Sequence, residues 1–554
     1  MCVAVRLTVS IRAFQLSMEC NVDGYRLPNR QKLAGHLLEE VHKEETEEML
    51  VKQKSEAAKC GIEISTDGAT KNRIPLVNCV VGTPSHKLVS EVRNTKGTSK
   101  TTEHLSKLTS DNIEKMPNEM KKNVYVVSTD GAECSVARDV AEKYGILDNL
   151  CPPHALNSLF KDWYNIEELK SVLDKAHDVV VFVLNHHKSK ALYDERSNKA
   201  LLLPADTRFT TRFIELARVL EVSDALKEMV ADRRWEQWLK GKSCRHAGAD
   251  VKRTVQDEEF WMAASEIKRA TEPASSLLRL CDSNRGVMGK VYYRMFAIGE
   301  ILRQDKDKFP TLGESAIDEM ENAHAARWSY MHRDVHAAAH CLDPEYHSQS
   351  VHGNNEVMRG FRRACAVLFD NKRTRVKAMK ELLYYKNSKG IFSQSETFEM
   401  AKGMSGAEWW ELVGAETPEI QRMALILLSK SGSVSMNERT WKEYSWVHSK
   451  SRNRLKPTRA EKLVIVHSNL RMREKIESMS VERGHLAHVV EWCEDNELVD
   501  GESSGGDDEV LSDDDDNAIL NLSEDGGEDV KGEEAKERGN VEEGKNDEKN
   551  SQDA

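Results

Sequence analysis

Residues 123–154, NVYVVSTDGAECSVARDVAEKYGILDNLCPPH, are the stretch that predicts the fold. They open with the apolar run Val124–Val127 between polar residues, which indicates a buried strand. The strand ends in Ser-Thr-Asp-Gly at 128–131, and an amphipathic helix is expected to follow it up to Tyr144, because Gly145 stands at the usual position of a C-cap glycine. Asp130 is therefore a carboxylate at the C-terminal end of a strand. In open α/β sheets, chemistry usually takes place at that edge.

A second stretch of the chain repeats this local design. Residues 61–68, GIEISTDG, predict another short strand that ends in Thr-Asp-Gly, so Asp67 occupies the same place as Asp130. Either aspartate by itself has a simpler explanation as a helix N-cap or a turn residue. The two together are more informative, since both follow predicted strands.

The elements around these two strands predict a particular order. Apolar runs and turn signals give strands at 74–81 and 87–93, a short strand segment at Cys151, and helices over 101–116 and 154–163. The order is three strands, a helix, a strand, a helix, a short strand and a helix. This is the layout of ribonuclease-H-like nucleotidyl transferases, in which the first and fourth strands lie side by side and bring their carboxylates together.

Charge is unevenly distributed along the 554 residues. The formal net charge is −12, but residues 501–554 contain 20 acidic and 5 basic side chains, which leaves the rest of the chain slightly basic. This tail has too few large apolar residues to offset the entropy lost on ordering, so we predict that it is disordered. An acidic tail can compete with nucleic acid for a basic surface, or it can simply keep the protein soluble.

Cysteine spacing and hydropathy exclude several classes of protein. The 11 cysteines contain no CxxC pair, so neither a zinc ribbon nor a disulfide framework is indicated. No segment has the apolar length of a secretory signal or a membrane span, the longest apolar run being 179–184. Reduced thiols in the cytosol or the nucleus are therefore expected.

The second half of the chain is dominated by helical periodicity. Residues 166–404 contain few strand signals, and only 179–184 is equally compatible with a strand and a buried helix. Thr417-Pro418-Glu419 is a strong helix start, with a cap, a proline at the first position and an acid in the first turn. Further helices are expected from about Ser435 and over 459–472.

Four motifs of the chain resemble the hAT superfamily of transposases, in the branch whose central region was catalogued as a domain of unknown function. They are STDGATKN at 65–72 with VRNTKGTSKTTEHL at 92–105, VYVVSTDGAECSVA at 124–137 with CPPHALNSL at 151–159, LLLPADTRFTTRF at 201–213, and the block 409–472. The last of these resembles the C-terminal hAT dimerisation region over nearly its full length.

The resemblance implies an α/β fold combined with an all-α part. A ribonuclease-H-like core with a mixed sheet would be interrupted by a large helical insertion, and a triad of acids would be completed after that insertion. Carried over to this chain, the three acids are Asp67, Asp130 and Glu438. Three carboxylates of this kind would hold two divalent cations, Mg²⁺ or Mn²⁺, that clamp the attacking and leaving oxygens of a phosphodiester.

Several of these assignments have structural alternatives. Ser435 and Glu438 form an S-x-x-E pattern, in which the glutamate would only close a capping box. The family motif makes Cys151 and His154 active-site neighbours, but two ligands are too few for a structural zinc site, and a buried cysteine followed by a helix-start histidine explains them equally well. Arg208, in the Thr-Arg-Phe block, is a candidate phosphate or active-site contact.

Two kinds of surface are also predicted. Two basic clusters could neutralise DNA phosphates, although a charge run can equally be a solvated face. The first contains Lys450, Arg452, Arg454, Lys456 and Arg459, and the second contains Arg359, Arg362, Arg363, Lys372, Arg373 and Arg375. The apolar helix faces of 418–472, together with the resemblance, predict a dimerisation surface formed by Ile420, Met423, Leu427, Trp441, Leu463 and Val466.

The expected organisation has six parts. They are a charged, mostly helical segment 1–60, the first part of the core 61–165, the helical insertion 166–404, the dimerisation region 405–475 that completes the core, a helical extension 476–500 and the acidic tail 501–554. Before Asp67 there is no Cys/His set with the spacing of the BED zinc finger with which family members usually begin. Ala69 and Ala155 also stand where the family commonly has an aromatic residue and a cysteine.

These observations lead to three hypotheses. The first is a nuclear hAT-type transposase or transposase-derived protein that cleaves and transfers DNA strands with Mg²⁺ or Mn²⁺. It would associate with DNA and with itself, and no membrane partner is expected. The second is a domesticated, catalytically inactive nuclear protein that binds DNA or chromatin and dimerises. The third is a helical scaffold in which the acids are only caps and turn residues.

Overall fold

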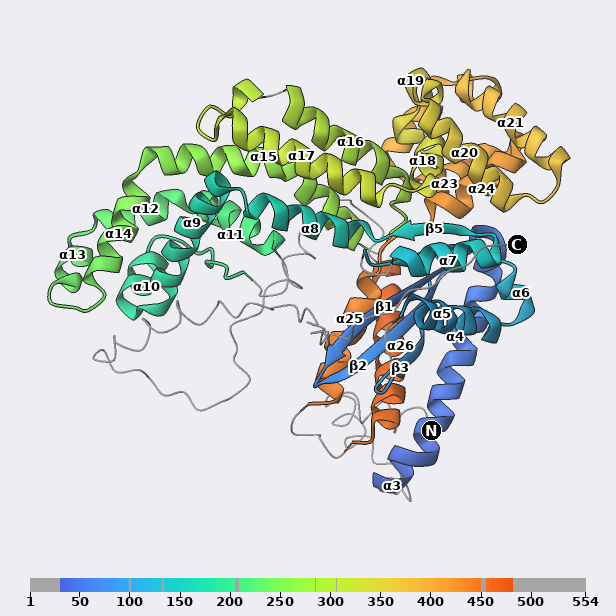
Figure 1. Ribbon diagram of the computed structural model, residues 1–554, viewed down its shortest axis with the longest axis horizontal. Helices are drawn as coiled ribbons and strands as arrows, with labels where there is room; N and C mark the ends of the chain where they lie inside the picture. Colours follow the sequence, from blue (N-terminus) through green and yellow to red (C-terminus); the bar gives the residue numbers. More distant parts are fainter. Residues whose placement is uncertain are drawn as a thin grey trace, which may run out of the picture.

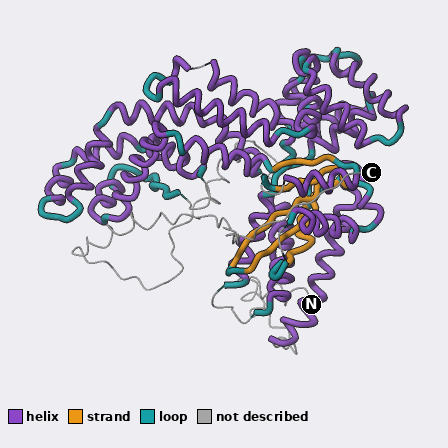
Figure 2. The backbone as a smooth tube through the Cα atoms, in the orientation of Figure 1, coloured by secondary structure: helices purple, strands orange, loops and turns teal. Residues whose placement is uncertain are grey.

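A computed structural model describes residues 30–98, 101–131, 134–204, 209–283, 285–304, 306–449 and 455–481. One sheet lies beside a long array of helices, and helices near both ends of the described chain, α4 (Leu38–Cys60) and α26 (Pro457–Val481), contact β3 (Lys87–Asn94) of the sheet (Figure 1). All other regular structure in the described residues is helical (Figure 2). No described helix is long and apolar enough to cross a membrane.

The sheet has five strands in the order β3-β2-β1-β4-β5. The strands are β1 (Ile62–Lys71), β2 (Ile74–Gly82), β3 (Lys87–Asn94), β4 (Val124–Thr129) and β5 (Leu147–Leu150). The first three are antiparallel neighbours, whereas β4 runs parallel to both β1 and β5. The expectation that the first and fourth strands lie side by side is confirmed.

Both faces of the sheet are covered, which explains why its strands are apolar on both sides. Helices α5 (Thr102–Lys115) and α7 (Cys134–Tyr144) share one core with Ile64 and Val127, and the short α6 (Asn118–Lys121) leads into β4. The opposite face packs against α25 (Ser435–Val447) and α26 (Pro457–Val481) through residues such as Val80, Tyr444 and Val464. The C-terminal helices therefore complete the core that the early strands begin.

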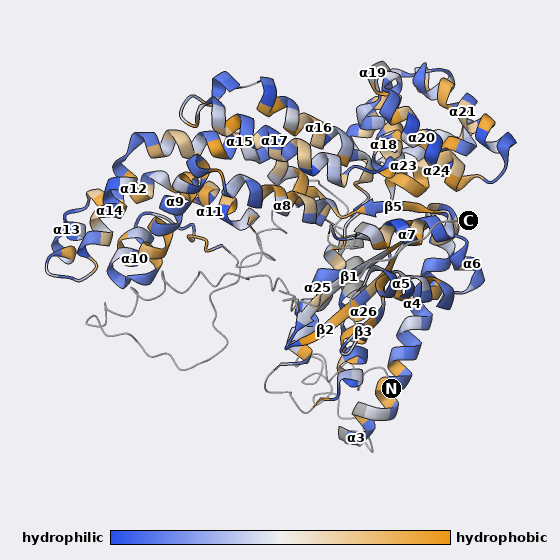
Figure 3. Ribbon diagram, in the orientation of Figure 1, coloured by the Kyte–Doolittle hydropathy of each residue, from blue (hydrophilic) through white to orange (hydrophobic). Residues whose placement is uncertain are grey.

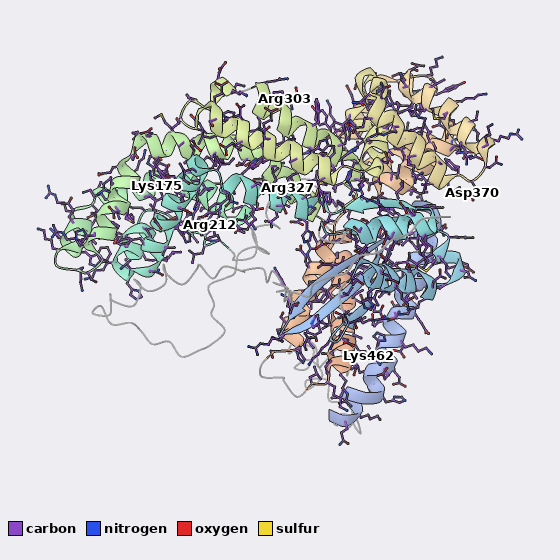
Figure 4. The ribbon with its side chains drawn as sticks, in the orientation of Figure 1. Lys175, Arg212, Arg303, Arg327, Asp370 and Lys462 are labelled. Carbon is purple, nitrogen blue, oxygen red and sulfur yellow. The ribbon has the colours of Figure 1, made fainter. Side chains whose placement is uncertain are left out.

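The first described helices also belong to this core. Residues Arg30–Lys32 form α3, Leu33–Leu37 form a π-helical turn (η1) and Leu38–Cys60 form α4. The described part of this charged segment is helical, and one face of α4 is buried. Buried residues recur every three or four positions along α4, at Leu38, Val41, Glu45, Met49, Gln53, Ala57 and Cys60. Lys462 of α26, labelled in Figure 4, lies 2.5 Å from the Glu39 carboxylate of α4.

A continuous run of helices begins directly after β5 with α8, ahead of residue 166, where the insertion was predicted to start. Its helices are α8 (Pro152–Tyr164), α9 (Glu167–Asn185), α10 (His187–Asp194), α11 (Thr210–Glu221), α12 (Ser223–Ala231), α13 (Arg233–Leu239), α14 (Arg245–Gln256), α15 (Glu258–Asp282), α16 (Met288–Gln304), α17 (Gly313–Met331), α18 (Asp334–Leu342), α19 (Gln349–Gly353), α20 (Asn355–Leu368), α21 (Lys372–Lys386) and α22 (Ser395–Glu399). Short 3₁₀ turns lie at Lys306–Lys308, Pro344–Tyr346, Gly390–Ser393, Met400–Gly403 and Gly414–Glu416.

Two details of the insertion depend on packing. The ambiguous run 179–184 is a buried helical segment of α9, since Val179, Val180 and Val183 all lie in the large helical core. The helical path is interrupted between α17 and α18, where Arg333 has extended backbone angles. Neither outcome can be derived from periodicity alone.

The last part of the chain returns to the sheet. Helices α23 (Gly406–Val413) and α24 (Pro418–Leu428) pack on each other, and Figure 3 shows α24 as a largely apolar helix. The predicted helix start at Pro418 is correct. A ribonuclease-H-like core interrupted by a helical insertion, the fold class expected from the sequence, is therefore confirmed.

Candidate active site

Asp67 and Asp130 lie at the same level of the sheet. In the parallel pairing of β1 with β4, Thr66 lies opposite Thr129, and the next residue on each side is one of the two aspartates. Asp130 follows the end of β4 as expected, but β1 does not end at Asp67, because it continues to Lys71 in its pairing with β2. Oxygens of both carboxylates and a ring nitrogen of His154 all lie within 4.8 Å of one another. Three side chains from separate elements thus form a cluster at the carboxyl edge of the sheet.

Helix α8 brings His154 to this cluster. The helix begins at Pro152, which places His154 in its first turn, directly after β5. Arg327 of α17 holds the other end of α8, donating from Nε and Nη2 to the two carboxylate oxygens of Asp162 at 2.6 and 2.9 Å (labelled in Figure 4). A bidentate pair of this kind fixes the orientation of α8 as well as its position.

Glu438 reaches the cluster through His154. Oε1 of Glu438 lies 3.0 Å from Nε2 of His154, and both side chains are about 30% exposed. Burial disfavours a charged imidazole, but the neighbouring Cys151 and Glu438 together raise the pKa of His154 above its ordinary value. The imidazolium therefore sits between the third predicted acid and the two aspartates, a contact that the sequence did not predict.

Asp67 is the most buried acid of the cluster. The indole N–H of Trp441 donates to its Oδ2 at 2.7 Å. Burial raises the pKa of Asp67 to about 6; the Trp441 hydrogen bond and the positive charge of His154 counteract this, and the charges of Asp130 and Glu438 add to it. A buried carboxylate with a second carboxylate close by is an unfavourable arrangement until a cation neutralises it.

The residue before Glu438 is fixed by a buried amide network. Ser65 of β1 donates to Oδ1 of Asn437 at 2.7 Å, and Nδ2 of Asn437 donates to the Ser65 carbonyl and to Oδ1 of Asn78. Nδ2 of Asn78 donates back to the Asn437 carbonyl at 2.8 Å. Because every partner lies on β1 or β2, α25 starts at a defined place above Asp67.

The capping-box alternative for Glu438 is not formed. Helix α25 has no side-chain hydrogen bond at its N-cap, Val434. Ser435 instead donates from its hydroxyl to Asp282 at 2.5 Å, and the Glu438 carboxylate contacts His154. The sequence pattern S-x-x-E is thus present for reasons other than helix capping.

The segment that leads into α25 is held from several sides. Gly432 adopts a left-handed conformation with φ +62°, and its carbonyl accepts a hydrogen bond from Asn149 at 2.8 Å. Asn149 also donates to Ser128 of β4, which in turn donates to Glu63 of β1 at 2.6 Å. The backbone N–H of Val434 points to the sulfur of Cys151 at 3.3 Å. Cys151 is thereby a buried contact that ties this segment to α8.

A histidine of the insertion joins the same network. Nδ1 of His336 accepts from the Arg333 backbone N–H at 3.1 Å, so Nε2 carries the proton and donates to Oδ1 of Asn149 at 2.9 Å. Burial lowers the pKa of His336, which keeps the ring neutral. On the outer side, the hydroxyl of Tyr330 donates to the carbonyl of Gly131, next to Asp130. The helical insertion therefore contacts the site at two places, at Asn149 through His336 and at Gly131 through Tyr330.

The donor set fits a divalent cation. Two carboxylates and one imidazole, all within reach of a single point, are ligands that such ions accept, with oxygen donors preferred by Mg²⁺ and nitrogen tolerated by Mn²⁺. A metal ion accepts only the neutral imidazole, so His154 would release its extra proton when Asp67, Asp130 and His154 hold the ion. Glu438, predicted as the third metal ligand, is not part of this group and contacts His154 instead.

The predicted DNA contacts are only partly described by the structure. Arg208, Lys450, Arg452 and Arg454 lie outside the described residues. Lys456 and Arg459 are exposed at the start of α26. In the second cluster Arg362, Arg363, Lys372 and Arg373 are exposed, Arg359 lies near Asp334 and Glu356, and Arg375 donates to backbone carbonyls.

The residues predicted to form the dimer surface pack within the chain. Ile420, Met423, Leu427, Trp441 and Val466 are buried, and Leu463 is partly buried against the same cores. Helical periodicity identifies an apolar face but not the element that covers it, which here is the sheet, α18 or α4 rather than a second molecule. These side chains are therefore core residues of the folded chain, and Trp441 is also the partner of Asp67.

Comparison with known families agrees with the fold. The family described as a domain of unknown function, DUF659, matches residues 28–179, and the hAT family C-terminal dimerisation region matches residues 390–470. No curated protein matches the chain. The resemblance to the hAT branch that combines these two regions is confirmed. These two matches support a hAT-type transposase or a protein derived from one, and the dimerisation region suggests self-association.

Proposed function

We propose that this protein is a nuclear enzyme that cleaves DNA and transfers the cut strands with the help of Mg²⁺ or Mn²⁺, acting as a dimer or higher oligomer. The observation that carries the proposal is the convergence of Asp67, Asp130 and His154 within 4.8 Å at one edge of the sheet. Neither a turn nor a cap requires two carboxylates so close together, and their mutual repulsion makes the site attractive to a cation.

The chain's own residues have distinct roles in this proposal. A divalent cation bound here supplies Lewis-acid chemistry for attack on a phosphodiester. Trp441 holds the Asp67 carboxylate in one orientation through its 2.7 Å hydrogen bond, and Asn437 fixes the start of the helix that carries Glu438. His154 holds a proton on Nε2 towards Glu438, so the two side chains are placed to exchange a proton with a nearby hydroxyl or water.

The experiment that tests this proposal compares metal binding with DNA cleavage. Purified full-length protein is titrated with Mn²⁺, and its cutting of supercoiled plasmid is followed with and without the metal. Asp130→Asn is expected to lose both Mn²⁺ binding and cutting, whereas Asp224→Asn, at an exposed position of α12, serves as the matched control. Wild-type protein that binds no Mn²⁺ would contradict the proposal.

A second candidate function is a domesticated, catalytically inactive DNA- or chromatin-binding protein that dimerises. The contact of Glu438 with the His154 imidazolium favours it, because an internal cation then occupies the place of a metal ion. This function predicts DNA binding without cutting, and an unchanged affinity for DNA when Asp67 and Asp130 are both replaced by asparagine. Assays of DNA binding and DNA cutting on the same purified protein therefore distinguish the two functions.

A further inference from the structure

A groove lies at the opposite end of β4 from the carboxylate cluster. It encloses about 470 Å³ between the core and the end of the insertion, and its lining comes from α6, β4, α7, the loop between α20 and α21, and α24. Figure 1 shows α6 and α7 next to this end of the insertion. Its core side includes Val124, the first residue of β4, whereas Asp130 follows the last, so the six-residue strand separates the two places by roughly 20 Å.

The lining of the groove is basic. Lys121, Lys122 and Arg422 contribute cations, and Asp370, labelled in Figure 4, is the one acid among the residues that line it. Lys122 and Arg422 are exposed, whereas Lys121 pairs with Glu114 at 2.5 Å. The net charge of the lining therefore favours an anionic ligand.

More cations surround its rim. The Lys143 ammonium lies 5.1 Å from the ring centre of Tyr144, a lining residue. Lys372 and Arg373 are exposed at the start of α21, directly after the lining residue Asn371. Lys372 and Arg373, which belong to the second basic cluster predicted from the sequence, therefore lie beside the groove.

Aromatic rings complete the lining. Tyr125 and Tyr144 are half-buried there. The Arg422 guanidinium lies 5.7 Å from the ring centre of Phe369 and donates from Nη2 to the Tyr125 hydroxyl at 3.1 Å. Arg375 donates to the carbonyls of Phe369 and Asp370, which fixes the loop that carries this ring. The planar cation is therefore held in place before any ligand arrives.

Cations beside partly exposed rings are the combination that binds single-stranded nucleic acid. Phosphates contact the cations, and unpaired bases stack on the rings or on a guanidinium plane. In a duplex the bases are already stacked and are not available to such rings. A volume of about 470 Å³ suits a short length of one strand.

We propose that this groove, lined by Lys122, Tyr125, Tyr144 and Arg422, is a binding site for single-stranded DNA that is separate from the carboxylate cluster. Such a site would hold a displaced or flanking strand while the cluster acts about 20 Å away. The proposal goes beyond strand cleavage, because binding here requires neither the metal nor the aspartates.

The test measures binding of a fluorescein-labelled 15-nucleotide single strand to the full-length protein by fluorescence anisotropy in EDTA. The double variant Lys122→Glu/Arg422→Glu is expected to bind at least tenfold more weakly, with a salt dependence reduced by about two released counterions. The matched control is Lys175→Glu/Lys268→Glu, which makes the same charge change at exposed positions of α9 and α15 and should change the affinity less than twofold.

Two further variants separate the ring contacts and the active site. Tyr125→Leu is expected to weaken single-strand binding several-fold without changing the salt dependence, because it removes stacking and not charge. Asp67→Asn/Asp130→Asn should bind the strand as tightly as wild type. Thermal unfolding of each variant establishes that it is folded.

Three results would overturn the proposal. One is equal affinity of the Lys122→Glu/Arg422→Glu protein and the Lys175→Glu/Lys268→Glu control. Another is a duplex of the same length that binds as well as the single strand, with no effect of Tyr125→Leu. The third is loss of EDTA-resistant binding in Asp67→Asn/Asp130→Asn, which would assign the strand to the carboxylate cluster. Absence of cleavage would leave all three measurements unchanged, so the two proposals fail independently.

Discussion

The indole nitrogen of Trp441 donates a 2.7 Å hydrogen bond to Oδ2 of Asp67, although the two residues belong to opposite ends of the chain. Both side chains are buried, so water does not compete for this bond. A hydrogen bond to a carboxylate stabilises its charged form, which here counteracts part of the cost of burying Asp67. The contact links the last helices of the core directly to the first aspartate.

Replacing Trp441 by phenylalanine removes the donor and keeps most of the apolar volume. We expect Trp441→Phe to lose about 1–3 kcal/mol of stability and to bind Mn²⁺ more weakly, because the Asp67 carboxylate is no longer held in one orientation. Urea denaturation and Mn²⁺ titration measure the two effects. Trp446→Phe is the control, since this tryptophan of the same helix is 47% exposed. Equal Mn²⁺ affinities of the two variants would contradict the assignment.

Replacing Asn437 by alanine should damage the core and the site together. The change leaves the buried polar atoms of Ser65 and Asn78 without their partners, which costs about 3 kcal/mol. We also expect weaker Mn²⁺ binding, because Glu438 follows Asn437 directly. The control is Asn118→Ala, at an exposed position of α6. A stability loss with unchanged metal affinity would show that Asn437 only supports the fold.

Lys430 predicts a pH dependence of stability. Burial lowers its pKa to about 8 in the folded chain, where its ammonium donates to the carbonyls of Cys60 and Gly61. The ordinary value is 10.5, so between pH 8 and 10.5 the unfolded chain binds more protons and stability rises with pH. Below pH 8 the full cost of the buried charge is present.

The variant Lys430→Met removes this titration. The stability of wild type relative to Lys430→Met should therefore increase by up to about 3 kcal/mol from pH 8 to 10.5, on top of a constant difference from the lost hydrogen bonds. Denaturation midpoints at several pH values measure it. Lys175→Met, at an exposed position, should show no such increase. A wild-type advantage that falls with pH would have the wrong sign for a buried lysine.

Leu427 tests the role of the apolar face of α24. The side chain is fully buried inside the chain, so Leu427→Ala is expected to lower the free energy of unfolding by about 2–5 kcal/mol without changing the oligomeric state of the folded protein. Light scattering and denaturation measure these properties. Leu412→Ala, at a site 61% exposed in the neighbouring helix α23, should be nearly neutral for stability. Dissociation of a folded oligomer by Leu427→Ala would instead place this residue at an interface between chains.

The fold was largely predictable because its signals are local. The run before Asp130 and the run before Asp67 each indicate a buried strand, and the parallel pairing of β1 with β4 places the two aspartates at the same level. The predicted end of the first strand is wrong, because β1 continues past Asp67 to Lys71 as one arm of the hairpin with β2. Helix boundaries such as the start of α24 at Pro418 follow from short-range chemistry. Such features depend on a few neighbouring residues, which the sequence displays in order.

The site was predictable only in part. The sequence and the resemblance predict Asp67, Asp130 and Glu438 as metal ligands and His154 as a neighbour, whereas the structure groups His154 with the two aspartates. They predict neither the contact of Glu438 with His154 nor the hydrogen bond from Trp441. Trp441 was assigned to a dimer surface because an apolar helix face looks the same whether it packs inside the chain or on a partner. Tyr330 gave no signal at all, since nothing in its local sequence relates it to Gly131.

The sequence by itself determined where most strands and helices form and which acids follow the apolar strand runs, because those properties follow from the spacing of apolar and turn residues over short distances. Tertiary structure decided which side chains meet. The position of Asn437 above β1 and β2, the placement of His154 between the carboxylates and Glu438, and the basic groove beside Arg422 all join segments far apart in the chain. Contacts of that kind depend on how whole layers pack, and no local pattern encodes them.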